Sequence, residues 1–147
     1  MILFLDFDGV LHPEPCHDGA QLFCRLPLLE SLLREFPEVV IVVSSTWRGT
    51  RTVEALRALF SDDIGRRVIG ATPSWRDLPE LVEMIGYQRQ AEIEGWLRQA
   101  GIPWEKWVAL DDKPWLYRPF LPNLVHCDRT VGVDEAAISR LRAKLKG

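Results

Sequence analysis

Five short apolar runs, rich in β-branched residues, constrain the fold of this chain more than any other feature of its sequence. They span Ile2 to Leu5, Val39 to Val43, Val68 to Ile69, Trp107 to Leu110 and Asn123 to His126. Apolar residues follow one another in these runs with little alternation, which is typical of strands buried on both faces of a parallel sheet. The runs therefore predict a sheet that is covered by helices on both sides.

Segments with a helical spacing of apolar residues separate these runs. They cover Leu28 to Phe36, Val53 to Phe60, Gln90 to Gln99 and Glu135 to Leu145. The expected order is βαβαβαβαβα, and right-handed crossovers then predict an α/β fold with a single doubly wound, mainly parallel sheet. The ligand site of such a sheet lies outside the carboxyl ends of its strands. No glycine-rich dinucleotide fingerprint competes for that edge.

The size and composition of the chain fit one globular domain over residues 1–147. Of the 147 residues, 47% are apolar and 27% are charged, which allows a sizeable core. The formal charge of -3 argues against a generally basic nucleic-acid binder. Arginine nevertheless suits fork-like contacts to phosphate, so a local phosphate site stays open.

The sequence also predicts a cytoplasmic protein with no membrane partner. No apolar stretch approaches the roughly 20 residues that cross a bilayer, and the first residues do not resemble a signal peptide. The odd number of cysteines, Cys16, Cys24 and Cys127, favours reduced thiols over a disulfide framework in a chain of this size.

Polar residues follow three of the predicted strands at the point where each strand ends. Asp6 and Asp8 follow the first strand, Ser44 follows the second, and Asp111 and Asp112 follow the fourth. All are expected at one edge of the sheet. Gathered carboxylates repel one another unless a cation lies among them, and ligands that are all oxygen favour Mg²⁺. The sequence thus predicts a magnesium site at this edge.

Four segments resemble, in chain order, the four motifs of the haloacid dehalogenase-like (HAD) hydrolase superfamily. They read DFDGVLH, VVIVVSSTWR, YQRQAEIEGWL and ALDDKPW, and the likeness covers nearly the whole chain. The chain is similar in particular to small members without a cap domain, a group associated in part with RNA-repair proteins. The resemblance implies a five-stranded Rossmann-like sheet of order 5-4-1-2-3, no separate cap, and a phosphatase that forms an aspartyl-phosphate intermediate.

The resemblance gives the motifs roles in phosphoryl transfer. Asp6 is the expected nucleophile, since a carboxylate can attack phosphorus when Mg²⁺ neutralises the phosphoryl oxygens. Asp8 is the expected general acid and base, which protonates the leaving oxygen and later deprotonates the hydrolytic water. Ser44 is expected to donate its hydroxyl to a phosphoryl oxygen. Arg89 is expected to screen the nucleophile and the phosphate, a role that lysine more commonly has in the superfamily.

The expected metal ligands are carboxylates and one backbone carbonyl. Asp6 is expected to bind Mg²⁺ with its side chain and Asp8 with its carbonyl oxygen, while waters complete an octahedral shell. Asp111, Asp112 or both supply further carboxylates, and Asp112 is the favoured direct ligand.

Substrate binding is assigned to three further residues of the motif segments, Ser45, Arg48 and Lys113. Arg48 and Lys113 are also the alternatives to Arg89 as the screening cation. The other interpretation of Arg89 itself is an exposed arginine on an amphipathic helix.

Two further groups of side chains allow other interpretations. One group has zinc-type ligands, His12, Cys16, His17 and Cys24. Its spacing matches none of the usual paired patterns, so an ordinary loop facing the substrate is favoured. The other group is Trp47 and Trp115, each three residues beyond a catalytic strand end. Both tryptophans can wall the mouth of the site, and stacking on a nucleobase is a minor alternative.

Two classes of function remain open from the sequence. The leading one is a Mg²⁺-dependent phosphomonoester hydrolase, and the alternative is a phosphate- or partner-binding module on the same fold without turnover. The presence of both Asp6 and Asp8 favours the enzyme. Halide or phosphonate cleavage is disfavoured, because a phosphoester leaving group is what requires the acid at Asp8.

The lengths between the motifs leave no room for a cap domain, so an open site is expected. Basic residues that follow the strand ends can form a cationic rim around it, namely Arg48, Arg51, Arg76, Lys113 and Arg118. The phosphorylated substrate can be a small molecule or a macromolecule. A cationic rim suits a phosphate at the end of a larger anionic molecule, for example a nucleic-acid end.

Overall fold

The computed structural model describes all residues 1–147 and contains one parallel sheet of five strands. The strands are β1 (Ile2–Leu5), β2 (Val40–Val43), β3 (Val68–Ala71), β4 (Trp107–Asp111) and β5 (Leu124–His126). Their order is β3-β2-β1-β4-β5, and every neighbouring pair is parallel. This is the predicted order 5-4-1-2-3 counted from the opposite edge, so the predicted fold is confirmed.

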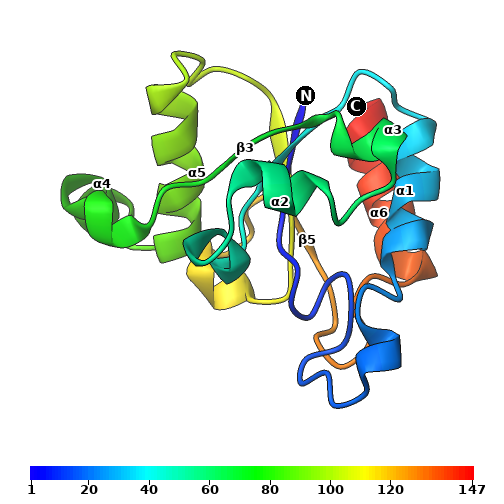
Figure 1. The fold of residues 1–147 in the computed structure, drawn as a ribbon. Helices are drawn as coiled ribbons and strands as arrows, with labels where there is room; N and C mark the ends of the chain where they lie inside the picture. The colour runs from blue at the N-terminus through cyan, green and yellow to red at the C-terminus, as the bar shows by residue number, and fades with distance from the viewer.

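Helices cover both faces of the sheet (Figure 1). One face carries α1 (Leu26–Arg34) and α6 (Glu135–Lys146), and the short helices α2 (Val53–Arg57) and α3 (Asp62–Gly65) pack on the same side. The other face carries α5 (Gln88–Gln99), against which α4 (Pro79–Ile85) packs. None of these helices has the length and apolar character needed to span a membrane.

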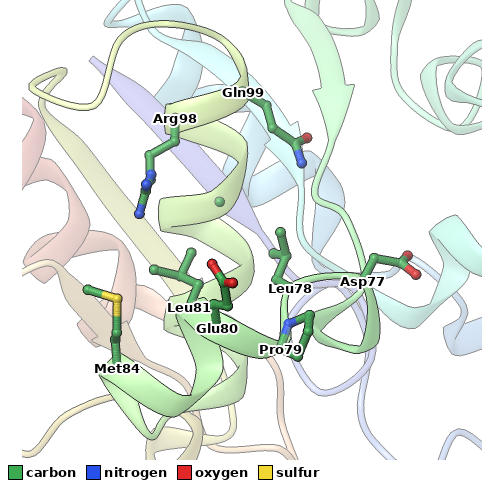
Figure 2. Close-up of a pocket in the computed structure, with 9 residues that line it drawn as sticks. Asp77, Leu78, Pro79, Glu80, Leu81, Met84, Arg98 and Gln99 are labelled. Atoms are coloured by element: carbon green, nitrogen blue, oxygen red, sulfur yellow. The ribbon is translucent and has the colours of Figure 1, made fainter.

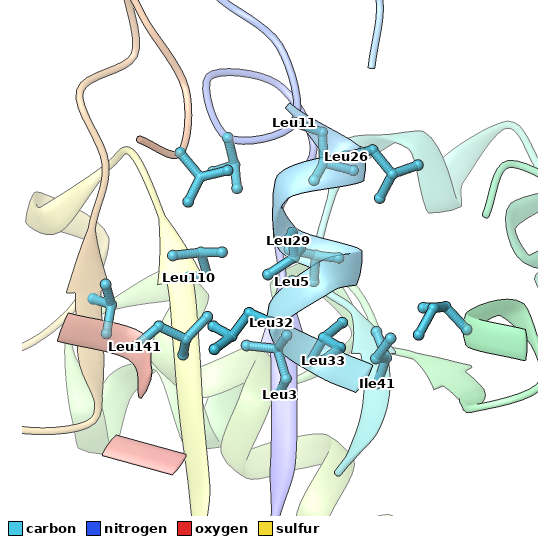
Figure 3. Close-up of a cluster of buried hydrophobic side chains, with 14 of the residues drawn as sticks. Leu3, Leu5, Leu11, Leu26, Leu29, Leu32, Leu33, Ile41, Leu110 and Leu141 are labelled. Atoms are coloured by element: carbon cyan, nitrogen blue, oxygen red, sulfur yellow. The ribbon is translucent and has the colours of Figure 1, made fainter. Parts of the chain in front are cut away.

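The two faces of the sheet have separate apolar cores, which explains why the strands lack alternation. Leu3 and Leu5 of β1 pack in the larger cluster with the leucines of α1 and α6 (Figure 3). Ile2 and Phe4, the intervening residues, pack in a smaller cluster with residues of α5. Because both faces are buried, each apolar side chain of the strand stabilises the fold, by about 1.5–3 kcal/mol when it is fully buried.

The expected strict alternation of strands and helices is wrong between β4 and β5. That connection holds only the 3₁₀ turn η4 (Pro114–Leu116) before the chain enters β5. Pro114, Pro119 and Pro122 lie in this segment. Proline lacks a backbone N–H and clashes with the preceding turn, so three prolines so close together oppose a crossover helix.

A small helical insertion between β3 and α5 was absent from the sequence prediction. It consists of the 3₁₀ turn η3 (Trp75–Asp77) and helix α4, which ends at Gly86 with a left-handed φ of 76°. Gly95 of α5 allows the insertion to pack closely, because a Cβ atom there would lie 2.5 Å from Leu78 Cδ1. The insertion is far smaller than a domain, and the structure has no separate cap, as predicted.

Candidate active site at the carboxyl edge of the sheet

The residues that follow three neighbouring strands lie in one row across the sheet. The last residue of β1, Leu5, is paired with the last residue of β2 and with the fourth residue of β4. The next positions, Asp6, Ser44 and Asp111, continue that row and are buried. Leu5 packs on the α1 side, and successive side chains of a strand point to opposite faces. The row is therefore directed toward α5.

Arg89 from the first turn of α5 meets this row. Its Nη1 atom lies 3.5 Å from Asp6 Oδ1 and 3.3 Å from Asp111 Oδ2, and it donates to the Ser44 carbonyl oxygen. Its Nε atom lies 3.5 Å from Glu92 Oε1. The alternative of an exposed arginine is wrong, because Arg89 is only 6% exposed. Burial opposes its charge, but the carboxylates of Asp111 and Asp6 raise its pKa, so Arg89 is a permanent cation here.

The aspartates of the row are poorly compensated by protein groups alone. Burial, together with the charge of Asp111, raises the pKa of Asp6 well above its usual value, although Arg89 opposes this. Burial likewise raises the pKa of Asp111. Asp6 Oδ2 is buried and has no hydrogen-bond partner. Oxygen atoms of Asp6, Asp111 and Asp112 all lie within 4.8 Å of one another. An orphaned carboxylate oxygen within an all-oxygen cluster fits a hard divalent cation such as Mg²⁺.

Asp111 and Asp112 differ in the groups that donate hydrogen bonds to their oxygens. Asp111 Oδ1 accepts the backbone N–H of Lys113 at 3.0 Å, and Asp111 Oδ2 accepts the Tyr117 hydroxyl at 2.9 Å. The Asp112 carboxylate accepts only from Lys113 Nζ, at 3.1 and 3.3 Å. Gly9, with a φ of 77°, lies against it, since a Cβ atom there would be 2.3 Å from Asp112 Oδ2. This arrangement favours Asp112 as the direct metal ligand and Asp111 as the anchor of Arg89 and Tyr117.

The two aspartates are expected to respond differently to amide substitution. Asp112→Asn should weaken Mg²⁺ binding by about 10–100-fold or more, because it removes the charge of a carboxylate whose only donor is the Lys113 side chain. Asp111→Asn is the matched control. It should lower the melting temperature, because the Asp111 carboxylate accepts from the Lys113 N–H and the Tyr117 hydroxyl, and it should weaken Mg²⁺ binding less than Asp112→Asn does. Calorimetric titration with Mg²⁺ and thermal melts of the metal-free proteins measure both effects. A larger loss of affinity in Asp111→Asn would contradict the assignment.

Asp8 lies at the mouth of the site, and its side chain is 33% exposed. It has two hydrogen-bond partners that the sequence pattern did not predict. His12 Nε2 lies 2.8 Å from Asp8 Oδ1, and the indole N–H of Trp47 donates to the same carboxylate. The zinc alternative is not supported, because His12 is engaged with Asp8 and the only metal-compatible group of three ligand-type side chains is the aspartate cluster. The only feature of the sequence that could have indicated the contact between Asp8 and His12 is their separation by four residues.

The three residues predicted to bind substrate have different surroundings. Ser45 Oγ accepts the backbone N–H of Trp47 and so caps the 3₁₀ turn η2 (Thr46–Gly49). Arg48 Nη2 lies 2.5 Å from Glu92 Oε2, so most of its charge is directed into the protein. Lys113 Nζ bonds Asp112 and therefore joins the carboxylate cluster. Of the three, Lys113 is the residue that the structure brings to the aspartates.

Ser44 and Thr72 present buried hydroxyl groups without partners. Thr72 follows β3 and continues the row beside Ser44, because Val43 is paired with Ala71. Neither Ser44 Oγ nor Thr72 Oγ1 has a hydrogen-bond partner. A buried hydroxyl without a partner is costly, so both groups are suited to a ligand or to water. Thr72 was missed because an uncharged residue after a weakly marked strand gives no distinctive signal.

A hollow of ≈ 320 Å³ adjoins the row on the α5 side. Its lining includes four basic residues, Arg48, Arg76, Arg89 and Lys113, and one acidic residue, Glu92. Arg89 and Lys113 belong also to the aspartate cluster, so the hollow and the row form one continuous site. The lining of the hollow by itself has an excess of positive charge, which is suited to an anionic substrate.

A second hollow, of ≈ 410 Å³, lies between α4 and α5 (Figure 2). Its lining includes Leu78, Leu81 and Met84 from the insertion and Arg98 from α5. None of the predicted site residues lines it. The row of Asp6, Ser44 and Asp111, together with the neighbouring Asp112, is therefore the candidate active site, and this hollow is not.

Comparison with known protein families gives one match. A family model described as HAD domain in Swiss Army Knife RNA repair proteins matches residues 2–138, a range that contains every residue of the candidate site. Searches of curated proteins and of solved structures each found no match.

Proposed function

The chain belongs to the family of HAD domains in Swiss Army Knife RNA repair proteins, and on that premise we propose that it is a Mg²⁺-dependent phosphomonoester hydrolase. The family supports a hydrolase of the HAD type. One observation carries the finer proposal: Asp6 has an unpartnered buried oxygen beside Arg89 and the other aspartates, two residues before the more exposed Asp8. That arrangement supplies a nucleophile, a counter-charge and a proton donor to the same phosphoryl group.

The proposed reaction has two steps. An Asp6 oxygen attacks phosphorus while the bond from phosphorus to the leaving oxygen breaks, and Asp8 gives a proton to that oxygen. Asp8 then takes a proton from water, whose oxygen attacks phosphorus and breaks the bond to Asp6, releasing inorganic phosphate. Mg²⁺, held by Asp6, Asp112 and the Asp8 carbonyl oxygen, would neutralise charge on the phosphoryl oxygens. Arg89 and Ser44 would stabilise the same oxygens from the protein side.

Hydrolysis of p-nitrophenyl phosphate, with and without Mg²⁺, tests this proposal directly. We expect turnover that requires the metal and disappears with a chelator. Inactivity with every divalent metal and across a broad panel of phosphoesters would instead support the binding module, the second class of function that this fold allows.

Asp8→Asn is expected to affect substrates according to their leaving groups. The amide cannot donate a proton as an acid, so alkyl phosphates should lose about 10²–10⁴-fold in kcat/KM, which reports the step that releases the leaving group. Aryl phosphates with activated leaving groups need little protonation and should lose at least ten times less. Steady-state kinetics on both substrate types measures the difference, and an equal loss on both would count against the acid role of Asp8.

The open, cationic surroundings of the site further suggest a phosphate at the end of a large anion. Three of the five rim residues, Arg51, Arg76 and Arg118, make no ion pair, and the Arg51 guanidinium lies 4.2 Å from the centre of the Trp47 ring. Arg76 similarly lies 5.0 Å from the ring centre of Trp75. These guanidinium groups remain available to phosphodiesters.

A terminally phosphorylated oligonucleotide should therefore be hydrolysed with a higher kcat/KM than small sugar phosphates. The advantage should shrink steeply as salt rises, because contacts to a polyanion release counterions. Substituting the three unpaired arginines, Arg51, Arg76 and Arg118, with glutamine should lower the oligonucleotide kcat/KM by about 10-fold or more and spare p-nitrophenyl phosphate. Arg66→Gln is the control, because Arg66 is exposed just before β3, at the edge of the sheet opposite the site. A hundredfold preference for a small metabolite would refute this prediction.

A further inference from the structure

Asp8 is held by two donors from different parts of the chain. His12 Nε2 lies 2.8 Å from Asp8 Oδ1. Trp47 Nε1 lies 3.1 Å from Oδ1 and 3.2 Å from Oδ2 of the same carboxylate. His12 belongs to the turn that follows β1, whereas Trp47 belongs to η2 after β2. These two donors, which we call the Asp8 clamp, therefore link the segments that follow β1 and β2.

The tautomer of His12 is determined by its second contact. The backbone N–H of Phe23 donates to His12 Nδ1 at 3.3 Å, so that nitrogen carries no proton. The neutral ring must then carry its proton on Nε2, which points at Asp8. His12 is only 1% exposed, so solvent does not compete for this contact.

Aromatic packing holds the rings that donate to Asp8. The centre of the Trp47 ring lies 5.2 Å from that of Phe23 and 5.7 Å from that of Phe7, with edge-on geometry in both pairs. The His12 ring also packs edge-on against Phe23, at 5.2 Å. Edge-on contacts of this kind are favourable and restrict ring orientation. Neither donor can turn away without breaking this packing.

We propose that His12 and Trp47 are positioning residues that orient Asp8 toward the leaving group of the substrate. The inference rests on the proposed phosphatase function. Asp8 Oδ1 receives both donors, while Oδ2 receives only one branch of the Trp47 contact. Asp8 Oδ2 is therefore the oxygen left to exchange a proton with the leaving group. A partly exposed aspartate without such a clamp would sample several rotamers, and a displacement of about 1 Å can cost about 10²-fold in rate.

Kinetics on two leaving groups tests this role. Trp47→Phe and His12→Leu each remove a donor but keep an apolar side chain. Both should lower kcat/KM for alkyl phosphates at least about 10-fold more than kcat/KM for p-nitrophenyl phosphate, because kcat/KM reports the step in which Asp8 protonates the leaving group. His12→Gln should restore most of the alkyl phosphate activity, since its amide nitrogen can replace Nε2. Trp104→Phe, at a position 77% exposed, is the control and should leave the ratio of the two activities unchanged.

An NMR spectrum of the indole N–H groups reports the contact between Trp47 and Asp8 without any turnover. The Trp47 resonance is identified as the one that disappears in Trp47→Phe. Asp8→Ala should shift this resonance and leave the other five tryptophan signals of the six in place. An equal loss on both substrates, or an unmoved resonance, would overturn the inference while the phosphatase assignment survives. A folded wild-type protein without phosphatase activity would overturn the proposed function and this inference with it, whatever the resonance does.

Discussion

Asp6→Asn is expected to reduce phosphatase turnover by at least about 10⁴-fold, because an amide cannot act as the nucleophile. The substitution is nearly isosteric, so the side chain can still occupy the row between Ser44 and Asp111. Steady-state and single-turnover kinetics measure the loss. Mass spectrometry of acid-quenched wild-type enzyme should find one phosphoryl group on the peptide that contains Asp6, and the variant should lack it.

The fold of Asp6→Asn should be at least as stable as that of the metal-free wild type. Burial and the neighbouring Asp111 make a charge at position 6 unfavourable in the folded state, and they raise the pKa of Asp6 for the same reason. A neutral amide removes that repulsion. Asp62→Asn, an exposed substitution in α3, is the control for both activity and melting temperature. Residual turnover above about one per cent of wild type would rule out Asp6 as the nucleophile.

Arg89→Met is expected to destabilise the metal-free protein by about 3–5 kcal/mol, the largest effect on stability that we predict. Methionine fills a similar apolar volume, but it leaves Asp6 and Asp111 without their shared counter-charge. In the wild type, Arg89 Nη1 lies 3.5 Å from Asp6 Oδ1 and 3.3 Å from Asp111 Oδ2. Denaturant unfolding of wild type, variant and Arg98→Met, an exposed arginine on the same helix, measures the difference.

Two conditions should reduce the penalty of Arg89→Met. Saturating Mg²⁺ should recover part of it, because the ion supplies positive charge to the same carboxylates. Lower pH should also reduce it. Burial raises the folded-state pKa of Asp6 and Asp111 above their unfolded values, so the folded protein takes up protons first and the stability lost at neutral pH returns as pH falls. A loss below about 1 kcal/mol at neutral pH without metal would show that Arg89 does not compensate these charges.

The sheet and the residues that lie at its carboxyl edge could be predicted well from the sequence, for a local physical reason. Consecutive apolar residues such as Ile2 to Leu5 can be buried only if both faces of the strand are covered, and the structure has one such sheet with helices on each side. Asp6, Ser44 and Asp111 had to meet, because each directly follows a strand or ends one and the strands are parallel. Strict alternation of strands and helices does not hold between β4 and β5, because the prolines there oppose a helix.

The chain by itself therefore determined which residues reach the carboxyl edge, and the tertiary structure decided which groups each of them contacts there. The difference between Asp111 and Asp112, adjacent and chemically identical, arises from Tyr117, Lys113 and the close approach of Gly9. The burial of Arg89 depends on how α5 packs against the sheet, which its weakly amphipathic sequence does not specify. Likewise, the donors to Asp8 come from separate loops, whose meeting depends on aromatic packing between segments distant in the chain. Such contacts follow from the orientation of packed elements, and local sequence patterns carry no information about that orientation.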